Sequence, residues 1–370
     1  MLWSALHEPA IFADYENDYD GPLHDNRAPG CCDVLFGVLR ACGMVCYIAC
    51  PPMPSHITRK LAFHPPPKGL TYHIELKSQP ERILKNIAEA KGQEIQLIIR
   101  NLSTQMDYIP DAKSVEVFSV ETSQHNHLVC VRCIPYEPST CSTLADQVIL
   151  FCQPNSSDIG GFLQPHIMNL TNYANIFEMD VYAFDYSGYG YSSGREGEKN
   201  VYADVRAVYQ HIRRAQPNKK IVLMGYSIGT TAAIDLACTN PEGLSGVVLV
   251  APFTSGLRLV SSKPAKPETC WADSFKSYDK IGSIDAKVLI CHGDMDEVVP
   301  LSHGLALYEK LKNPVPPSVV HGANHHTVLS GRHSQTFSRI LRFLKNETDV
   351  KTRTTEISSR SDNNASFKST

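Results

Sequence analysis

The chain has 370 residues, 42% hydrophobic and 20% charged, so it can bury a sizeable core and is not a globally disordered protein. Its formal net charge is −3 at pH 7, and a nucleic-acid partner is not expected because that would need clustered Lys and Arg. The sequence shows no internal repeat and no phosphate-cradling GxxxxGK[ST] loop.

Polar segments are predicted to flank the folded part. Residues 1–30 are acidic and carry Pro, Gly and Asn, which predicts a disordered tail; residues 348–370 are polar and predict a second one. The first residues lack the basic and apolar regions of a secretory signal. We therefore expect an intracellular protein with reduced cysteines.

A cysteine-rich apolar stretch, CCDVLFGVLRACGMVCYIACPP, lies within the segment 31–70, whose remainder is a proline-rich connector. Disulfides are disfavoured without an export signal, and a zinc site would need CxxC pairs or histidines at ligand spacing. A span needs about twenty apolar residues, and the apolar run is shorter and contains Arg40. S-acylation, with several chains giving stable membrane attachment, fits best. The candidate lipidation sites are Cys31, Cys32, Cys42, Cys46 and Cys50.

The pattern from 71 to about 112 is ambiguous, and we expect irregular packing with one short helix there. Further along, helical patterns such as 203–215, 231–238 and 338–346 alternate with β-rich runs. This order predicts an α/β fold: a mostly parallel, eight-stranded sheet with helices on both faces. The predicted strands are 115–120, 128–134, 147–151, 180–186, 220–225, 246–251, 287–292 and 317–321.

The sequence KIVLMGYSIGTTA (220–232) runs from an apolar strand through G-x-S-x-G into a helix of small residues. Such a strand-to-helix turn exposes a serine and aims the N–H groups of the helix terminus at a developing oxyanion. We therefore predict Ser227 as a nucleophile; the alternative is a serine that only caps the helix.

A serine nucleophile needs a base and an acid that orients the base, and in this strand–turn–helix context they follow in the order acid, then histidine. Two later strands end in loops that carry such residues. From the residues alone, Asp294, Asp296 and Glu297 stay open for the acid, and His321, His325 and His326 for the base. His292 is expected to brace the strand-end turn.

The oxyanion hole is expected to use the backbone N–H of Ile228 together with one from the loop ILFCQPNSSDIGG after the third strand. By position, Asn155 supplies the second N–H. The alternative is that this loop is only a surface turn. No HExxH and no matching His and carboxylate cluster occurs, so neither a metal nor another cofactor is expected.

From about residue 42 to 347 the chain resembles the alpha/beta hydrolase domain-containing protein 17 family of membrane-attached palmitoyl-protein thioesterases. The resemblance predicts an α/β-hydrolase domain over 71–347, with Ser227 as nucleophile, Asp296 as acid and His325 as base. It also implies S-acylated membrane proteins as substrates, a location at the cytoplasmic face of plasma and endosomal membranes, and a monomer. The residues that carry it are CPPMPSHITRKLAFHPP, DYSGYGYSSG, NVYADV, GYSIGT, PFTSG, HGDMDEV, SHGLALYE and GANH.

The chain departs from this family at the loop after the third strand, where H-G-N-A becomes Gln153-Pro154-Asn155-Ser156, and at Tyr226, which replaces a glutamine. Loss of the histidine and glycine is expected to leave the oxyanion loop less braced, which could weaken activity. Between the predicted strand 246–251 and the helix near residue 302 lie only about fifty residues, including strand 287–292, which leaves no room for a large lid. Two other functions remain open. One is a lipid esterase of the monoacylglycerol type; the other, suggested by Gln153-Pro154, is a weakened hydrolase that binds acylated partners.

Overall fold

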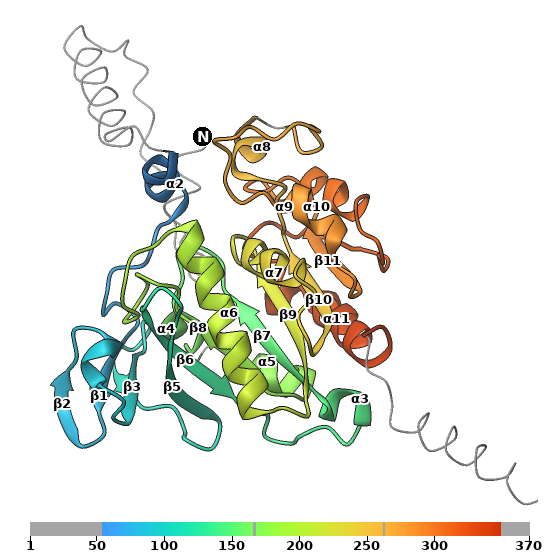
Figure 1. The fold of residues 1–370 in the computed structure, drawn as a ribbon. Coiled ribbons are helices and arrows are strands. Elements are labelled where there is room, and N and C mark those ends of the chain that lie inside the picture. Colours follow the sequence, from blue (N-terminus) through green and yellow to red (C-terminus); the bar gives the residue numbers. More distant parts are fainter. Residues whose placement is uncertain (1–53, 166–167, 262, 349–370) are drawn as a thin grey trace, which may run out of the picture.

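A computed structural model describes residues 54–165, 168–261 and 263–348 (Figure 1). The predictions for the acidic tail, the five cysteines and the last residues lie outside this part. No helix among the described residues has both the length and the apolar character to cross a membrane.

Eight strands form the main sheet, in the order β12-β11-β10-β9-β7-β8-β6-β5. β5 and β6 pair antiparallel, β6 pairs antiparallel with β8, and the remaining neighbours are parallel. Every predicted strand overlaps one of them, so the α/β fold is confirmed. The strands are β5 (Val115–Glu121), β6 (His127–Cys133), β7 (Gln147–Cys152), β8 (Val181–Phe184), β9 (Lys220–Tyr226), β10 (Leu244–Val250), β11 (Val288–Gly293) and β12 (Ser318–Val320).

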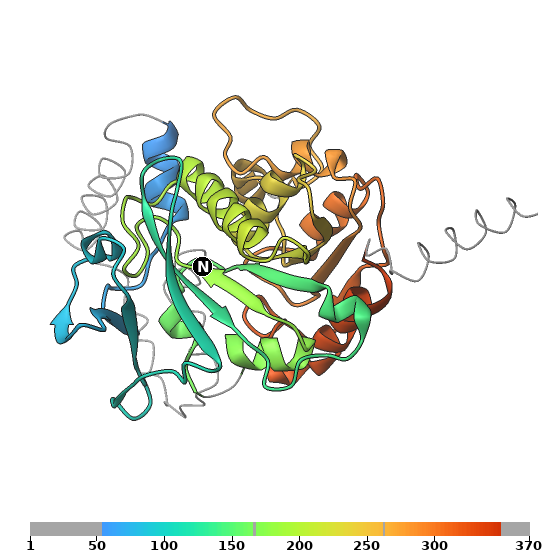
Figure 2. The same cartoon turned by 60° about the horizontal axis from the view of Figure 1, so that its bottom comes forward.

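Helices cover both faces of this sheet (Figures 1 and 2). The central strands read as continuous apolar runs because alternate side chains enter two different cores: Val148 and Leu150 of β7 pack on one face, Ile149 and Phe151 on the other. α6 (Glu198–Ala215), α7 (Gly229–Ala237) and α10 (Leu301–Tyr308) close the first core; α5 (Leu170–Phe177) and α11 (Ser334–Asn346) close the second.

The prediction of irregular packing for residues 71–112 was wrong, whereas the one short helix expected there is present. This stretch forms a second, antiparallel sheet in the order β2-β1-β3-β4, and its only helical turn is the 3-10 helix η1 (Ile87–Ala90). β2 is exposed along its whole length and shows no alternation, so only its pairing with β1 makes it a strand. The strands are β1 (Tyr72–Leu76), β2 (Gln79–Ile83), β3 (Ile95–Arg100) and β4 (Asp107–Tyr108).

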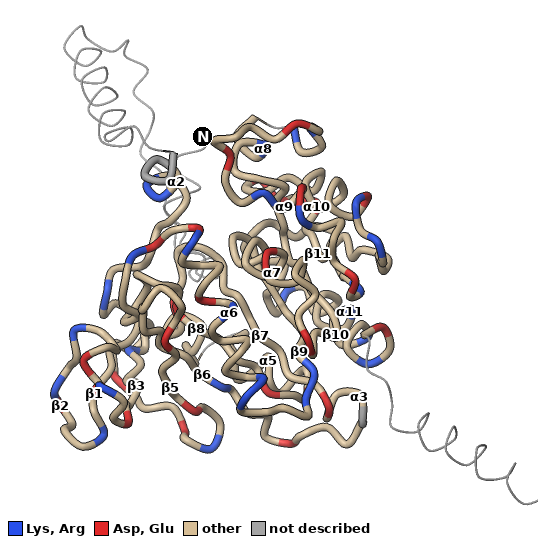
Figure 3. Tube along the Cα trace, viewed as in Figure 1, with Lys and Arg blue, Asp and Glu red and all other residues tan. Residues whose placement is uncertain are grey.

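Short elements complete the described chain: α2 (Pro54–Ala62), α3 (Ser142–Ala145), α4 (Ile159–Phe162), α8 (Gly256–Ser261), α9 (Ser277–Lys280), η2 (Ile281–Ser283) and η3 (Gly331–His333). Between β10 and β11, the described residues form α8, α9, η2 and their loops. α2 and α8 lie near the top of the molecule in Figure 1. Figure 3 shows Lys and Arg interspersed with Asp and Glu along the chain.

Candidate active site

Ser227 lies at the turn between β9 and α7. Its φ is 53°, a left-handed conformation that non-glycine residues adopt at a cost, so the surrounding structure must impose it. The N–H of Ser227 donates to the carbonyl of Val250 at 2.9 Å, and the hydroxyl of Thr230 donates to the Ser227 carbonyl at 2.6 Å. These contacts fix the turn through the backbone of Ser227 and leave its hydroxyl free to contact another side chain.

The two glycines that flank Ser227 are required by close packing. A Cβ on Gly225 would lie 2.6 Å from the carbonyl oxygen of Gly229, and one on Gly229 would lie 2.1 Å from the carbonyl oxygen of Cys152. Both distances are far shorter than real contacts, so side chains are excluded at these positions. The G-x-S-x-G pattern therefore has a structural cause, and the turn sits directly against the end of β7.

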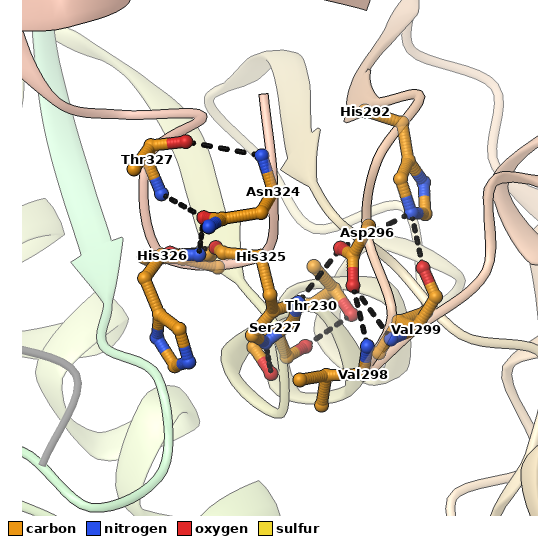
Figure 4. Close-up of polar contacts among 11 residues, drawn as sticks. Ser227, Thr230, His292, Asp296, Val298, Val299, Asn324, His325, His326 and Thr327 are labelled. Carbon is orange, nitrogen blue, oxygen red and sulfur yellow. Dashed lines mark hydrogen bonds and ion pairs between the residues drawn. The ribbon is translucent and has the colours of Figure 1, made fainter. Parts of the chain in front are cut away.

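Three side chains from separate loops meet at this turn (Figure 4). His325, after β12, has its Nε2 3.0 Å from Ser227 Oγ. Its Nδ1 lies 2.8 Å from Oδ2 of Asp296, which follows β11. The Asp296 side chain is fully buried, and that of His325 is 8% exposed. If Nδ1 carries the proton toward the carboxylate, Nε2 is left to accept the serine proton, as a general base requires.

Hydrogen bonds hold Asp296 in its ionised form. Burial by itself would raise the pKa of this carboxyl group, but hydrogen bonds from His292 and His325 and from the backbone N–H of Val299 bring the pKa below its ordinary value. The N–H groups of Val298 and Val299 both donate to Oδ1, at 3.0 and 2.7 Å. Oδ2 is thereby left to face the imidazole.

The other candidates for acid and base either lie on the surface or, in the case of His326, lie beside the ring of His325. Asp294 Oδ2 contacts His321 Nδ1 at 2.8 Å, but the His321 side chain is 86% exposed and this pair lies on the surface. Glu297 is exposed. His326 has its ring centre 5.5 Å from that of His325. Of the alternatives that the residues left open, the structure brings Asp296 and His325 to Ser227.

His292 braces the loop after β11, as predicted. Its Nε2 donates to the Val299 carbonyl at 2.7 Å and lies 3.5 Å from Oδ2 of Asp296. The ring is almost fully buried. His292 therefore holds the turn that presents the carboxylate.

The proposed oxyanion donors are the N–H groups of Ile228 and Asn155. Ile228 follows the serine at the start of α7, and the loop after β7 packs against the same turn through Gly229. Neither N–H group takes part in a hydrogen bond within the part of the chain that the structure describes. Both are thus available to an oxyanion, and their role remains a prediction.

The expected loss of bracing in this loop was wrong, because Gln153 braces it instead. This side chain is buried, and its Nε2 donates to Oδ1 of Asp185 at 3.0 Å and to the Ser157 carbonyl at 3.3 Å. Asp185 Oδ1 also accepts the N–H of Ile159 at 2.8 Å, so one carboxyl group holds both ends of the loop. The turn itself is made at Ser156, a serine in the left-handed region with a φ of 53°.

Tyr226 stands out in the sequence only as a departure from relatives. The structure shows that its buried hydroxyl donates a hydrogen bond to the backbone carbonyl of His325, and that the two ring centres lie 5.8 Å apart. A tyrosine beside the nucleophile thus fixes the loop that carries the histidine. No local signal could have shown this, because the two residues lie 99 positions apart.

Within the described residues, no three His, Cys, Asp or Glu side chains converge as they would in a metal site. The arrangement is suited to acyl transfer, because a hydroxyl, an imidazole and a buried carboxylate stand in hydrogen-bonded sequence.

The sheet order and the strand–turn–helix serine define the chain as an α/β hydrolase by fold. A solved structure, the esterase Pf2001 of Pyrococcus furiosus, is similar with a TM-score of 0.50 and 18% identity over 62% of this chain and 91% of that one. A family profile described as serine aminopeptidase, S33, matches residues 166–272.

Curated relatives narrow this class to one family. Alpha/beta hydrolase domain-containing protein 17B of Homo sapiens is 33% identical over 308 residues, which cover 82% of this chain and 96% of the relative. Alpha/beta hydrolase domain-containing protein 17C of Xenopus tropicalis is 34% identical over 313 residues, covering 82% and 94%. The chain belongs to the alpha/beta hydrolase domain-containing protein 17 family.

Proposed function

We propose that this protein is a serine hydrolase that removes fatty acyl groups, such as palmitoyl, from cysteine thioesters of membrane-attached proteins. The observation that carries the proposal is the hydrogen-bonded sequence Ser227–His325–Asp296 at a strand-to-helix turn. Family membership supports hydrolysis. The thioester preference rests on the resemblance to this family's thioesterases. The short elements described between β10 and β11 support an open site that suits an acyl chain presented on a protein.

The proposed reaction begins when Ser227 Oγ attacks the acyl carbonyl carbon and His325 Nε2 takes the hydroxyl proton. The resulting oxyanion is stabilised by the N–H groups of Ile228 and Asn155. Collapse breaks the C–S bond, the cysteine sulfur leaves with the proton from His325, and the acyl group stays on the serine. Water, deprotonated by His325, then releases the fatty acid and restores the hydroxyl. Asp296 keeps the imidazole oriented and stabilises its charged form.

A fluorophosphonate probe tests this proposal, since it reacts only with an activated serine. We expect the full-length protein to be labelled and Ser227→Ala to remain unlabelled. Ser245→Ala, which removes a buried hydroxyl at the start of β10, is the matched control and should label normally. If the wild-type protein is no more labelled than Ser227→Ala, the proposal is wrong.

The acyl bond is tested by turnover of two substrates. We expect an S-palmitoyl peptide to be hydrolysed with a kcat/KM clearly above that for a monoacylglycerol. The reverse preference would favour the lipid-esterase function instead. Because Gln153 already braces the oxyanion loop, the double substitution of Gln153→His and Pro154→Gly should not raise the rate. A large gain would show that the natural loop is impaired.

We also propose that acylated cysteines hold the protein at the cytoplasmic face of membranes, near its substrates. The supporting feature is the set of five cysteines in one apolar segment, since a single acyl chain anchors weakly and several anchor stably. Replacement of all five by serine should move the protein from the membrane fraction to the soluble fraction. Unchanged fractionation would rule this attachment out.

A further inference from the structure

The side chain of Asn155 joins the loop after β7 to the end of α2, about ninety residues earlier. Its Nδ2 donates to the carbonyl of Ala62 at 2.9 Å and lies 3.2 Å from Nδ1 of His64. Its Oδ1 accepts the backbone N–H of His64 at 3.1 Å and the hydroxyl of Tyr189 at 2.7 Å. Both ends of the amide are therefore engaged, and three of the four contacts go to residues 62–64.

The segment that holds Asn155 is itself anchored on the body of the molecule. Phe63 is buried, with its ring centre 5.7 Å from that of Phe275. On α2, the hydroxyl of Thr58 lies 3.0 Å from that of Ser274. Because these contacts do not involve Asn155, residues 62–64 offer it a fixed support.

The middle of the loop after β7 is linked by hydrogen bonds to other segments only at Asn155, within the described chain. Its ends are tied to Asp185 through Gln153 and the N–H of Ile159. Within the described chain, the hydrogen bonds that link residues 154–156 to other segments all come from the Asn155 side chain. Ser156, next in sequence, is in the left-handed region, so the backbone must be held in this conformation.

We propose that residues 62–64 are a positioning element of the active site, which sets the backbone N–H of Asn155 for the oxyanion by holding its side chain. The inference rests on the proposed function, because it assumes that this N–H acts in catalysis. An oxyanion donor works only at a defined place: loss of one costs about a hundred- to a thousand-fold in rate, and small displacements cost part of that. Residues 62–64, which come after the predicted membrane-anchoring cysteines and α2 in the sequence, thus act on the reaction through Asn155.

The test is Asn155→Ala in the full-length protein, with a short-chain water-soluble 4-nitrophenyl ester as substrate. This change removes all four side-chain contacts and keeps the backbone N–H. We expect kcat to fall by about ten- to a hundred-fold with KM within about two-fold, since the N–H acts on the transition state and not on substrate binding. Asn169→Ala is the matched control: it removes a similarly bonded asparagine that caps α5, and should leave kcat unchanged.

A second variant tests the support itself. His64→Ala should lower kcat by a few-fold, and should have no further effect in the Asn155→Ala background, because both changes break the same link. If Asn155→Ala does not fold, Tyr189→Phe removes a single contact to the same side chain and should also lower kcat alone.

Three results would overturn the inference: an unchanged kcat in Asn155→Ala, fully additive effects of the two changes, or a loss confined to KM. In each case the wild-type protein still labels with the fluorophosphonate, so the proposed function survives. A wild-type protein that neither labels nor turns over would overturn both.

Discussion

Two Asp–His pairs in this protein have the same contact distance but differ strongly in their exposure to solvent. Asp296–His325 and Asp294–His321 both join Oδ2 to Nδ1 at 2.8 Å, and both link the loop after β11 to the loop after β12. The first pair has an aspartate side chain with no exposure and a histidine side chain that is 8% exposed. In the second, those side chains are 30% and 86% exposed.

The difference shows that a short Asp–His contact does not by itself make an acid–base pair. Both aspartates accept backbone N–H groups as well as an imidazole, but water cannot compete for the contacts of the buried Asp296. Its histidine has a serine within 3.0 Å on the far side. The surface pair has no such third partner in the described structure, and solvent weakens its attraction.

Substitution of the two histidines should give the largest difference in kcat between the buried pair and the surface pair. His325→Ala removes the proposed base and should lower kcat for an acyl ester by about a million-fold, as loss of the base does in a serine triad. His321→Ala should stay within about two-fold of the wild type. Steady-state kinetics on both variants, with folding checked by circular dichroism, measures this. Equal losses would mean that the surface pair takes part in the reaction.

Substitution of the two aspartates should give a smaller difference in kcat between the pairs. Asp296→Asn keeps the shape of the side chain but cannot hold the imidazole in the required tautomer, which should cost about ten-thousand-fold in kcat. Asp294→Asn, the matched change two residues earlier, should leave kcat within about two-fold. The comparison fails if Asp294→Asn is the more damaging substitution.

Tyr226→Phe tests the support of the buried pair from the nucleophile side. It removes one hydroxyl that donates to the His325 carbonyl and keeps the ring. A hydrogen bond of this kind contributes about 1 kcal/mol, so kcat should fall by about five-fold. An unchanged kcat, together with an unchanged free energy of unfolding by urea, would show that the hydroxyl does not fix the loop.

The smallest expected difference between the two aspartates is in how the free energy of unfolding depends on pH in acid. The pKa of Asp296 is below its ordinary value, so the folded state binds fewer protons there than the unfolded state. Its contribution to stability is present above about pH 4 and is lost as the pH falls below that value. In urea titrations between pH 6 and pH 2, Asp296→Asn should therefore show a shallower decline than the wild type.

Asp294 provides the control for that measurement. Hydrogen bonds from His321 and from the N–H of Gly322 also lower the pKa of Asp294, but this pair is exposed. Its contribution is screened by solvent, so Asp294→Asn should keep the wild-type dependence on pH. A shallower decline in Asp294→Asn than in Asp296→Asn would contradict the assignment of the buried pair.

The sequence predicted the main sheet and the serine turn because both have strong local signals. The runs 147–151 and 220–225 are apolar on both faces, and the pattern around Ser227 requires two glycines for packing that the structure shows. The small sheet of residues 72–108 was not predicted, because β2 has no alternation of apolar and polar residues and becomes a strand only by pairing with β1.

The acid and base could not be separated from the residues alone. Asp294 and Asp296 both follow the same buried strand, and the turn between them decides which side chain faces inward. The resemblance selected Asp296 and His325, and these are the two that the structure places beside Ser227. The contacts of Gln153 and Asn155 could not be predicted from the sequence either, because their partners Asp185 and His64 are distant in sequence.

The most direct test of the central claim is to identify the acyl-enzyme. Full-length protein mixed with an S-palmitoyl peptide and quenched in acid during the first turnover should carry one palmitoyl group, and peptide mapping by mass spectrometry should place it on Ser227 as an ester. The same experiment with Ser227→Ala should show no acyl group there and no released peptide thiol above background. Turnover of the thioester by Ser227→Ala at the wild-type rate would contradict the account.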